Sequence, residues 1–318
     1  MTVNDPINLT DPADAAALVP YLLGYHPYDR LVILALRQCR IHFIAAAPLT
    51  RDLASSCALI ADKGPDQILL LGYGDDQPVT TAVDHTTAAF TDFGIPVLAA
   101  FRVHADRIWH LHCGEPDCHH DGTPFQPDST VAAAYATYHG LTAATDVDAL
   151  AARLDPVTGP ERAALTDAYH RAARHLHQLL DDCTDQQITD TFHTLLDELL
   201  TETAHAYQSG RLTDDRAALL NILLGLGPLR DRAARHVHGD DLHLRTWTDL
   251  TRRATPDCVA GPATMLAVAA LQAGQGALAR LAVQRAHHAD PGDPFLHTVA
   301  GWVRSGVHPD TVHHLLHD

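Results

Sequence analysis

Gln67-Ile-Leu-Leu-Leu-Gly-Tyr73 is a continuous apolar run of about the length of one strand. Such a run is typical of a β-strand covered on both faces, because a half-exposed strand alternates apolar and polar side chains. Helical spacing precedes it over Arg51 to Lys63, and a second helical segment follows from about Pro78 to Phe90. The run therefore predicts a strand inside a sheet that has helices packed on it.

Other apolar segments extend this sheet on both sides in the sequence. Leu31 to Arg37 and Ile41 to Ala47 are separated by a short polar segment, which predicts a hairpin. Pro96 to Val103 and Arg107 to His112 predict two further strands that meet at a turn. A capped helix from Asp11 to Gly24 precedes them all. This order of elements indicates an α/β fold with a mixed sheet.

The composition changes after Gly140. A polar segment rich in Thr and Asp follows, Thr142 to Asp148, and helical periodicity dominates beyond it. We therefore predict an α/β domain over residues 1–141 and an all-α domain over residues 149–318, a division that suits a chain of 318 residues.

Within the helical half, the stretch from Gly261 to Gly306 resembles a tetratricopeptide-like unit. Ala279, Val283 and Ala286 occupy the positions of its second helix, and Pro291 that of its closing proline. One and a half units cannot form a solenoid. We therefore expect a tetratricopeptide-like helical hairpin with a cap, an element that resembles interaction modules.

The formal net charge is −17, from 39 acidic and 22 basic residues. This disfavours a nucleic-acid partner or an anionic membrane surface, because both bind clustered Lys and Arg. The apolar runs are shorter than the roughly 18 residues of a membrane span, and the N-terminus has no signal-peptide pattern. We expect a soluble, cytoplasmic protein.

A small basic cluster stands out in this acidic chain, at Arg230, Arg232, Arg235 and His236. We interpret it as the solvated face of a helix. A site for an acidic partner or a phosphate-bearing ligand is the alternative.

Two cysteines and four histidines gather in the stretch Trp109-His-Leu-His-Cys-Gly-Glu-Pro-Asp-Cys-His-His-Asp121. Thiolates and imidazoles are the ligands that Zn²⁺ prefers. On a strand, His110 and His112 would share one face, and the turn after it could bring the two thiols together. The candidate zinc ligands are Cys113, Cys118, His112, His119 and His120.

The spacing in this stretch leaves other interpretations open. A strong zinc signature has two separated ligand pairs, and this chain has one dense cluster. The cysteines could instead be small side chains of a structural loop, or they could form a disulfide, which a cytoplasmic setting disfavours. If the loop is an enzyme centre, Glu115 or Asp121 is the candidate general base.

The segment Pro20-Tyr-Leu-Leu-Gly-Tyr-His-Pro27 forms a corner between the first helix and the first strand. Gly24 ends the helix, and the next residues turn the chain. The candidate ligand contacts at this edge of the sheet are Tyr25, His26, Asp29 and Arg30. A corner without a ligand is the alternative. If the sheet brings this corner near Cys113, the two would together form the default pocket.

Gly72-Tyr-Gly74 lies between a strand and a helix, where a dinucleotide-binding fingerprint would lie. Gln77 replaces the third glycine of that fingerprint, and Asp75 and Asp76 would repel a phosphate. A turn capped by aspartate is the favoured interpretation.

These motifs together resemble an actinobacterial family catalogued as domain of unknown function 4192. The resemblance rests on Pro20 to Pro27, Asp29 and the strand from Leu31, and on Cys113, Cys118, Gly122-Thr-Pro124 and Ala132 to Ala134. It covers most of the chain and implies a fold, but no activity. The family has Cys-x4-Cys-Cys-Pro where this chain has Cys118-His119-His120, which exchanges one type of metal ligand for another.

The sequence favours a non-catalytic ligand-binding or regulatory protein. A small ligand or a structural zinc would occupy the sheet half, and a protein partner would contact the helical half. No serine-hydrolase elbow, zinc-protease helix or Walker A loop occurs. A metal-dependent hydrolase centred on Cys113 to Asp121 is the alternative, and an oxidoreductase that uses the two cysteines is a third. Three protein ligands with an open position would favour hydrolysis, and a closed tetrahedron would favour structure.

Overall fold

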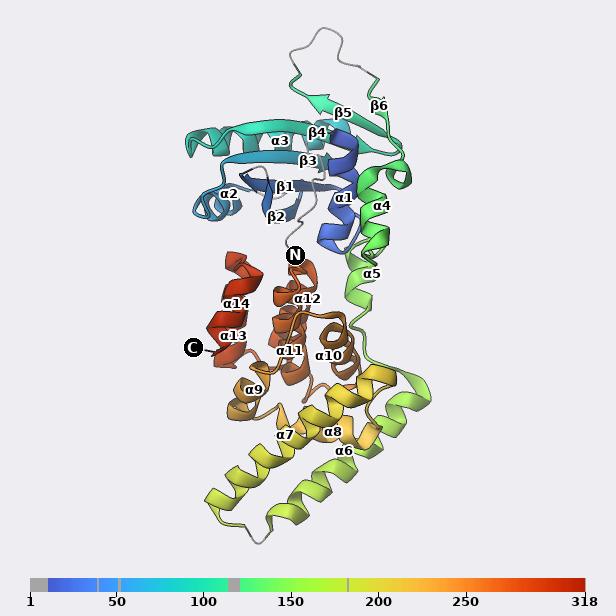
Figure 1. Ribbon diagram of the computed structural model, residues 1–318, viewed down its shortest axis with the longest axis vertical. Coiled ribbons are helices and arrows are strands. Elements are labelled where there is room, and N and C mark those ends of the chain that lie inside the picture. Colours follow the sequence, from blue (N-terminus) through green and yellow to red (C-terminus); the bar gives the residue numbers. More distant parts are fainter. Residues whose placement is uncertain (1–10, 39, 51–52, 114–120, 182, 318) are drawn as a thin grey trace. The chain divides into compact units, whose positions relative to one another are not determined.

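The computed structural model describes residues 11–38, 40–50, 53–113, 121–181 and 183–317. The chain divides into two compact units, one up to Leu150 and the other from Ala151. The first holds a mixed six-stranded sheet with helices, and the described residues of the second form helices joined by loops (Figure 1). The predicted fold class is confirmed.

The sheet of the first unit has the strand order β2-β1-β3-β4-β5-β6. Strands β3 and β4 are parallel, and the other neighbours are antiparallel. The elements are α1 (Pro12–Leu23), β1 (Arg30–Arg37), β2 (Arg40–Pro48), α2 (Ala54–Ala61), β3 (Gln67–Tyr73), α3 (Asp76–Asp92), β4 (Val97–His104), β5 (Arg107–Leu111), β6 (Thr123–Pro124), the 3-10 turn η1 (Pro127–Ser129), α4 (Val131–Tyr138) and α5 (Val147–Ala152).

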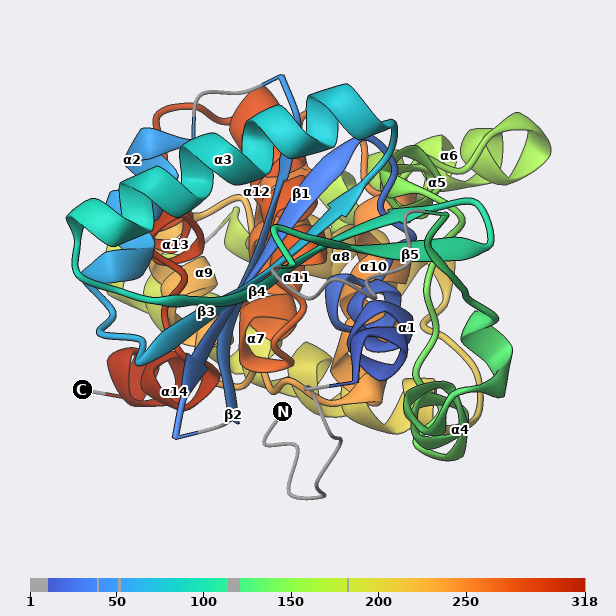
Figure 2. The same cartoon turned by 90° about the horizontal axis from the view of Figure 1, so that it is seen from above.

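Strand β3 is buried on both faces, as its sequence predicted. Ile68 and Leu70 belong to a core that includes Val79 and Phe90 of α3. Leu69 and Leu71 alternate with them, so they point to the opposite face, and they are also buried. Figure 2 shows α3 along one face of the sheet with α2 beside it.

Helix α1 begins and ends where the sequence predicted. The Asp11 side chain accepts a hydrogen bond from the Ala13 N–H at 2.8 Å, and Gly24 ends the helix with a left-handed φ of 79°. Helix α1 packs against α4 and η1. The buried Tyr73 hydroxyl, at the end of β3, donates a hydrogen bond to the Ala16 carbonyl at 3.1 Å. The hydrogen bond joins α1 to the end of β3.

The second unit is organised around α11, which is apolar and buried along its whole length from Ala260 to Leu271. Helices α11 and α12 pack along each other as a helical hairpin. The elements are α6 (Gly159–Leu180), α7 (Asp185–Ser209), α8 (Asp214–Leu223), α9 (Gly227–Ala234), α10 (Asp241–Arg253), α11 (Ala260–Gln272), α12 (Gly276–Ala289), α13 (Pro294–Ser305) and α14 (Pro309–His317).

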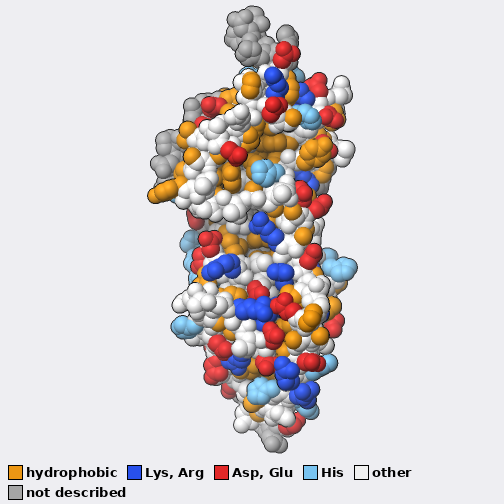
Figure 3. Space-filling view, turned by 90° about the vertical axis from the view of Figure 1, so that its right-hand side faces the viewer, with side chains coloured by type: hydrophobic (Ala, Val, Ile, Leu, Met, Phe, Trp, Pro, Cys, Tyr) orange, Lys and Arg blue, Asp and Glu red, His pale blue; other side chains and the backbone are white. Residues whose placement is uncertain are grey.

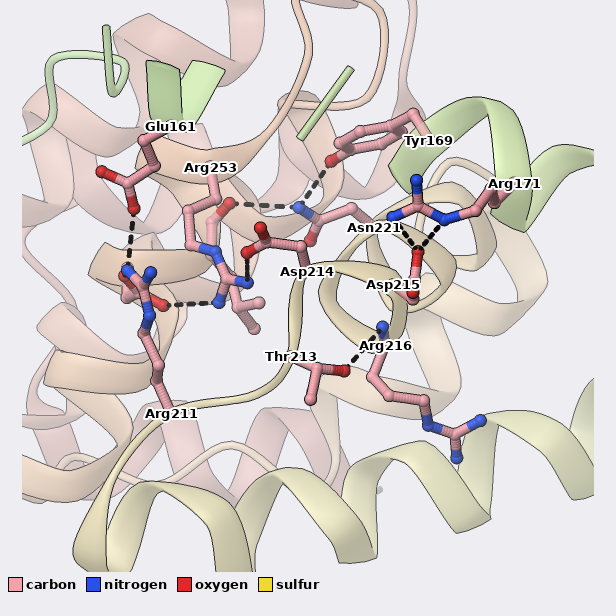
Figure 4. A network of polar contacts seen from close by, with 12 residues as sticks. Glu161, Tyr169, Arg171, Arg211, Thr213, Asp214, Asp215, Arg216, Asn221 and Arg253 are labelled. Carbon is pink, nitrogen blue, oxygen red and sulfur yellow. Dashed lines mark hydrogen bonds and ion pairs between the residues drawn. The ribbon is translucent and has the colours of Figure 1, made fainter. Parts of the chain in front are cut away.

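A buried polar network holds α8 and α10 together (Figure 4). Arg253 is fully buried and contacts Asp214 at 2.6 Å and Asp249 at 3.1 Å. Asn221, also buried, donates hydrogen bonds to the Tyr169 hydroxyl at 2.8 Å and to the Leu250 carbonyl at 3.1 Å. The network gives partners to both Nη atoms of Arg253 and to Nδ2 of Asn221, which would otherwise be costly to bury.

A second buried ion pair corrects the interpretation of the basic cluster. Arg230 was expected on a solvated face, but only 3% of it is exposed, and its Nη1 lies 2.8 Å from Oδ2 of the buried Asp293. Asp293 also caps α13 by accepting from the N–H groups of Phe295 and Leu296. Arg230 therefore anchors the start of α13.

Candidate ligand-binding site

A cavity of about 380 Å³ opens at the carboxyl ends of the parallel strands β3 and β4. Its walls come from α1 and the corner after it, from the two strand ends and from the segment around η1. Figure 3 shows hydrophobic side chains around a hollow on this side of the first unit. The polar and aromatic side chains that line it are Tyr21, His26, Tyr28, Tyr73, His104, Phe125 and Asp128.

The topology explains why the cavity lies at this edge. In open α/β sheets, the crevice outside the carboxyl ends of parallel strands is where ligands bind. Two hydrogen bonds tie the corner to the segment that follows α4: the His26 N–H donates to the Ala144 carbonyl at 2.9 Å, and the Ala144 N–H donates to the Gly24 carbonyl at 2.8 Å. The corner is therefore a fixed wall of the cavity.

The four predicted ligand contacts of the corner have different surroundings. His26 is exposed and lines the cavity. Tyr25 is buried, and the Arg30 guanidinium lies 5.7 Å from the centroid of its ring. Asp29 has a left-handed φ of 49°, and its Oδ1 would lie 2.8 Å from a Cβ at Gly74. Of the four, only His26 is among the cavity's lining residues.

Sequence reasoning missed the aromatic side chains of the cavity. Tyr21 lies inside the Pro20 to Pro27 motif, and Tyr28 follows it directly. Tyr73 and His104 end the two parallel strands, and this pairing of β3 with β4 brings them to one edge. The available signal was Tyr73 at the end of one predicted strand and His104 directly after another.

The charged groups at the cavity are mainly acidic. Asp128 lines it, and His104 Nδ1 lies 3.8 Å from Oδ1 of Asp75. Among the described lining residues there is no lysine or arginine. Burial raises the pKa of Tyr73 well above its ordinary value, so its hydroxyl remains a hydrogen-bond donor.

The Cys/His stretch begins within β5 and leaves this strand at the end that lies farther from the cavity. The strand ends at Leu111, and His112 has a left-handed φ of 59°. The expectation that His110 and His112 share a strand face is therefore wrong, because strand alternation stops before His112. The His110 ring lies 4.8 Å from the Phe101 ring, while His112 Nε2 lies 2.9 Å from Oδ1 of Asp84 on α3.

The remaining predicted metal and catalytic residues are only partly described. Cys113 carries a free, half-buried thiol. Glu115, Cys118, His119 and His120 lie outside the described residues. Asp121 is exposed. Among the residues that the structure describes, no group of three or more His, Cys, Asp or Glu is placed to hold a metal ion.

Both flanks of the Cys/His stretch are anchored to the sheet. Arg107 Nη1 donates hydrogen bonds to the carbonyls of Asp121 at 2.7 Å and Gly122 at 2.8 Å. The guanidinium of Arg102 stacks on the Trp109 ring, 3.7 Å from its centroid. A Cβ at Gly122 would lie 2.6 Å from the same ring. The ends of the stretch are thus fixed by packing and by backbone hydrogen bonds.

The strand register separates Cys113 from the cavity. Val103, which lines the cavity, pairs with Ile108, whereas Leu111 pairs with Ala100. Leu111 lies three residues after Ile108 along the strand, a distance of roughly 10 Å, and Cys113 lies beyond Leu111. Among the described lining residues of the cavity, Cys113 does not occur.

Comparison with known proteins places the chain in a family. The family model described as Domain of unknown function (DUF4192) matches residues 12–310. The chain belongs to this family. No curated protein and no solved structure matches it. Both the cavity and Cys113 of this DUF4192 protein lie inside the matched span. Among its described residues, no helix is long and apolar enough to cross a membrane.

The first glycine of Gly72-Tyr-Gly74, near the end of β3 in this DUF4192 protein, has a packing role. A Cβ at Gly72 would lie only 2.2 Å from Cγ1 of Val79 on α3. Gly72 therefore lets α3 approach the strand closely.

Proposed function

We propose that this protein binds a small ligand in the cavity at the carboxyl ends of β3 and β4 and catalyses no reaction there. The supporting observation is the cavity itself, which has aromatic walls and a few polar groups that converge on it. Its volume of about 380 Å³ falls in the usual range for small-molecule sites. Its described lining residues include no serine, threonine, cysteine or lysine, four of the side-chain types that form covalent intermediates.

Blocking the cavity tests this proposal. Ala105 is an exposed lining residue, so Ala105→Trp should fill the cavity from its rim. Ala134→Trp is the matched control, since Ala134 is an exposed residue of α4 outside the lining. In ligand-observed NMR with a library of small fragments, fragments that bind the wild type should bind Ala134→Trp and not Ala105→Trp. Equal binding to both variants, or no binding to the wild type, would refute the proposal.

A structural zinc site is a second candidate, favoured by the pair of His112 and Asp84. Metal-binding histidines usually donate their other ring N–H to a carboxylate. His112 Nε2 is 2.9 Å from Asp84, which leaves Nδ1 as the ligand atom, and the free thiol of Cys113 is adjacent in the chain. Cys118 and one of the two histidines His119 and His120 would supply the remaining two ligands of a four-ligand zinc site.

Elemental analysis of protein purified without an affinity tag tests the zinc site. We expect one zinc per chain in the wild type, its loss in Cys113→Ser/Cys118→Ser, and its retention in the control Cys183→Ser. Metal-free wild type would refute the site. If the wild type contains zinc, X-ray absorption will distinguish two kinds of site. Four protein ligands support a structural role, and three protein ligands with an open position support the metal-dependent hydrolase.

A further inference from the structure

We propose that the cavity at the ends of β3 and β4 selects an organic cation, namely a small molecule with a quaternary ammonium group. This inference rests on the proposed ligand-binding function and specifies the chemical class of its ligand.

Aromatic rings supply the first argument. Tyr21, Tyr28, Tyr73 and Phe125 all border the cavity. Tyr73 and Phe125 are 8% and 5% exposed and form its interior, while Tyr28 is 72% exposed at the rim. The faces of aromatic rings attract cations, and this attraction is strongest where the cation is withdrawn from water.

The charges around the cavity supply the second argument. Asp128 lines the cavity, Asp29 lies beside its Gly74 wall, and Asp75 lies beside its His104 wall. The described lining residues contribute no lysine or arginine, and the guanidinium of the neighbouring Arg30 lies over the Tyr25 ring. An anionic ligand would meet these carboxylates with no lysine or arginine beside the imidazoles of His26 and His104, whereas a cation complements them.

The aromatic and apolar share of the lining narrows the class of cation. A primary ammonium has three donors to satisfy. Pro20, Pro27 and Pro127 add apolar walls that carry no side-chain hydrogen-bond acceptor. A quaternary ammonium has no N–H group, so rings, apolar walls and one carboxylate are sufficient for it.

Choline and its neutral isostere 3,3-dimethylbutan-1-ol provide a matched test, because they share a shape and differ in charge. In NMR titrations of the full chain, we expect choline to bind about tenfold more tightly than the isostere. Asp128→Asn and Tyr21→Ala should weaken choline binding several-fold, and Asp128→Asn should leave binding of the isostere unchanged. The control Asp92→Asn removes an exposed carboxylate elsewhere in the same unit and should change neither.

The outcomes separate this inference from the proposed function. If neutral fragments bind in a manner that Ala105→Trp abolishes, while choline binds no better than its isostere, the cation preference is wrong and ligand binding stands. If neither class binds, the proposed function fails as well. Phosphatidylcholine vesicles present the same ammonium on a lipid, and we expect no co-sedimentation with them. Co-sedimentation that Asp128→Asn abolishes would overturn the assignment to a free small molecule.

Discussion

The Nη2 atom of Arg253 lies 2.6 Å from Oδ1 of Asp214, a residue 39 positions earlier in the chain. Arg253 is fully buried, and its Nη1 contacts Asp249, which also accepts a hydrogen bond from the Tyr207 hydroxyl. Burial, and then the charge of Asp249, raise the pKa of Tyr207, so this hydroxyl remains a donor. A buried guanidinium is costly without partners, and these carboxylates are therefore what make Arg253 tolerable in the core.

Arg253→Ala should destabilise the protein by about 3 kcal/mol, because it leaves Asp214 and Asp249 without their shared partner. Urea unfolding followed by circular dichroism measures the free energy of unfolding. The control is Arg171→Ala, which removes an ion pair of 2.7 Å to Asp215 between two half-exposed side chains. It should cost less than about 1 kcal/mol. Equal losses of unfolding free energy in the two variants would show that the buried network stabilises the protein no more than an exposed ion pair does.

Gly72→Ala should destabilise the first unit by about 2 kcal/mol, since the new methyl group overlaps Val79. Val79→Ala removes the overlapping atoms, although it costs stability by itself. We expect the double variant to be less destabilised than the sum of the two single variants, by at least about 1 kcal/mol in urea unfolding. Strict additivity would mean that the contact of α3 with β3 does not require a glycine at position 72.

Acidification should destabilise the protein partly through His243. Burial, and to a lesser degree the neighbouring His238, lower the pKa of His243, while Asp240 opposes this shift. The unfolded chain then takes up the proton first, so the stability contribution is complete above about pH 6.5 and declines as the pH falls toward the lowered folded value. Unfolding measured from pH 8 to pH 5 should show a shallower loss of stability in His243→Gln than in the wild type. Parallel curves would contradict this assignment.

The predicted helical domain should fold without the sheet. A fragment of residues 146–318 keeps Asp146, whose side chain accepts from the Ala149 N–H at the start of α5, and retains the core around α11. We expect cooperative thermal unfolding of this fragment by circular dichroism. The control fragment 185–318 lacks α6 and the Tyr169 partner of Asn221, and should unfold without cooperativity. If the longer fragment is also non-cooperative, residues 149–318 are not an independent domain.

Sequence reasoning succeeded where structure depends on neighbouring residues. The apolar run of β3 predicted a strand buried on both faces, and Asp11 and Gly24 predicted the ends of α1. Each of these signals is complete within a few residues, because periodicity and helix capping are local properties of the chain. The sequence by itself therefore determined the α/β half, the helical half and most of their elements.

Tertiary structure alone decided which side chains meet. The sequence around Arg230 and Arg253 does not indicate that these side chains are buried. Their partners Asp293 and Asp214 come from distant positions, although Asp249, the second partner of Arg253, lies four residues before it. The cavity likewise depends on the parallel pairing of β3 with β4, which brings Tyr73 and His104 to the corner at His26. Such encounters depend on how loops close between remote segments, and composition or spacing within one segment carries no record of them.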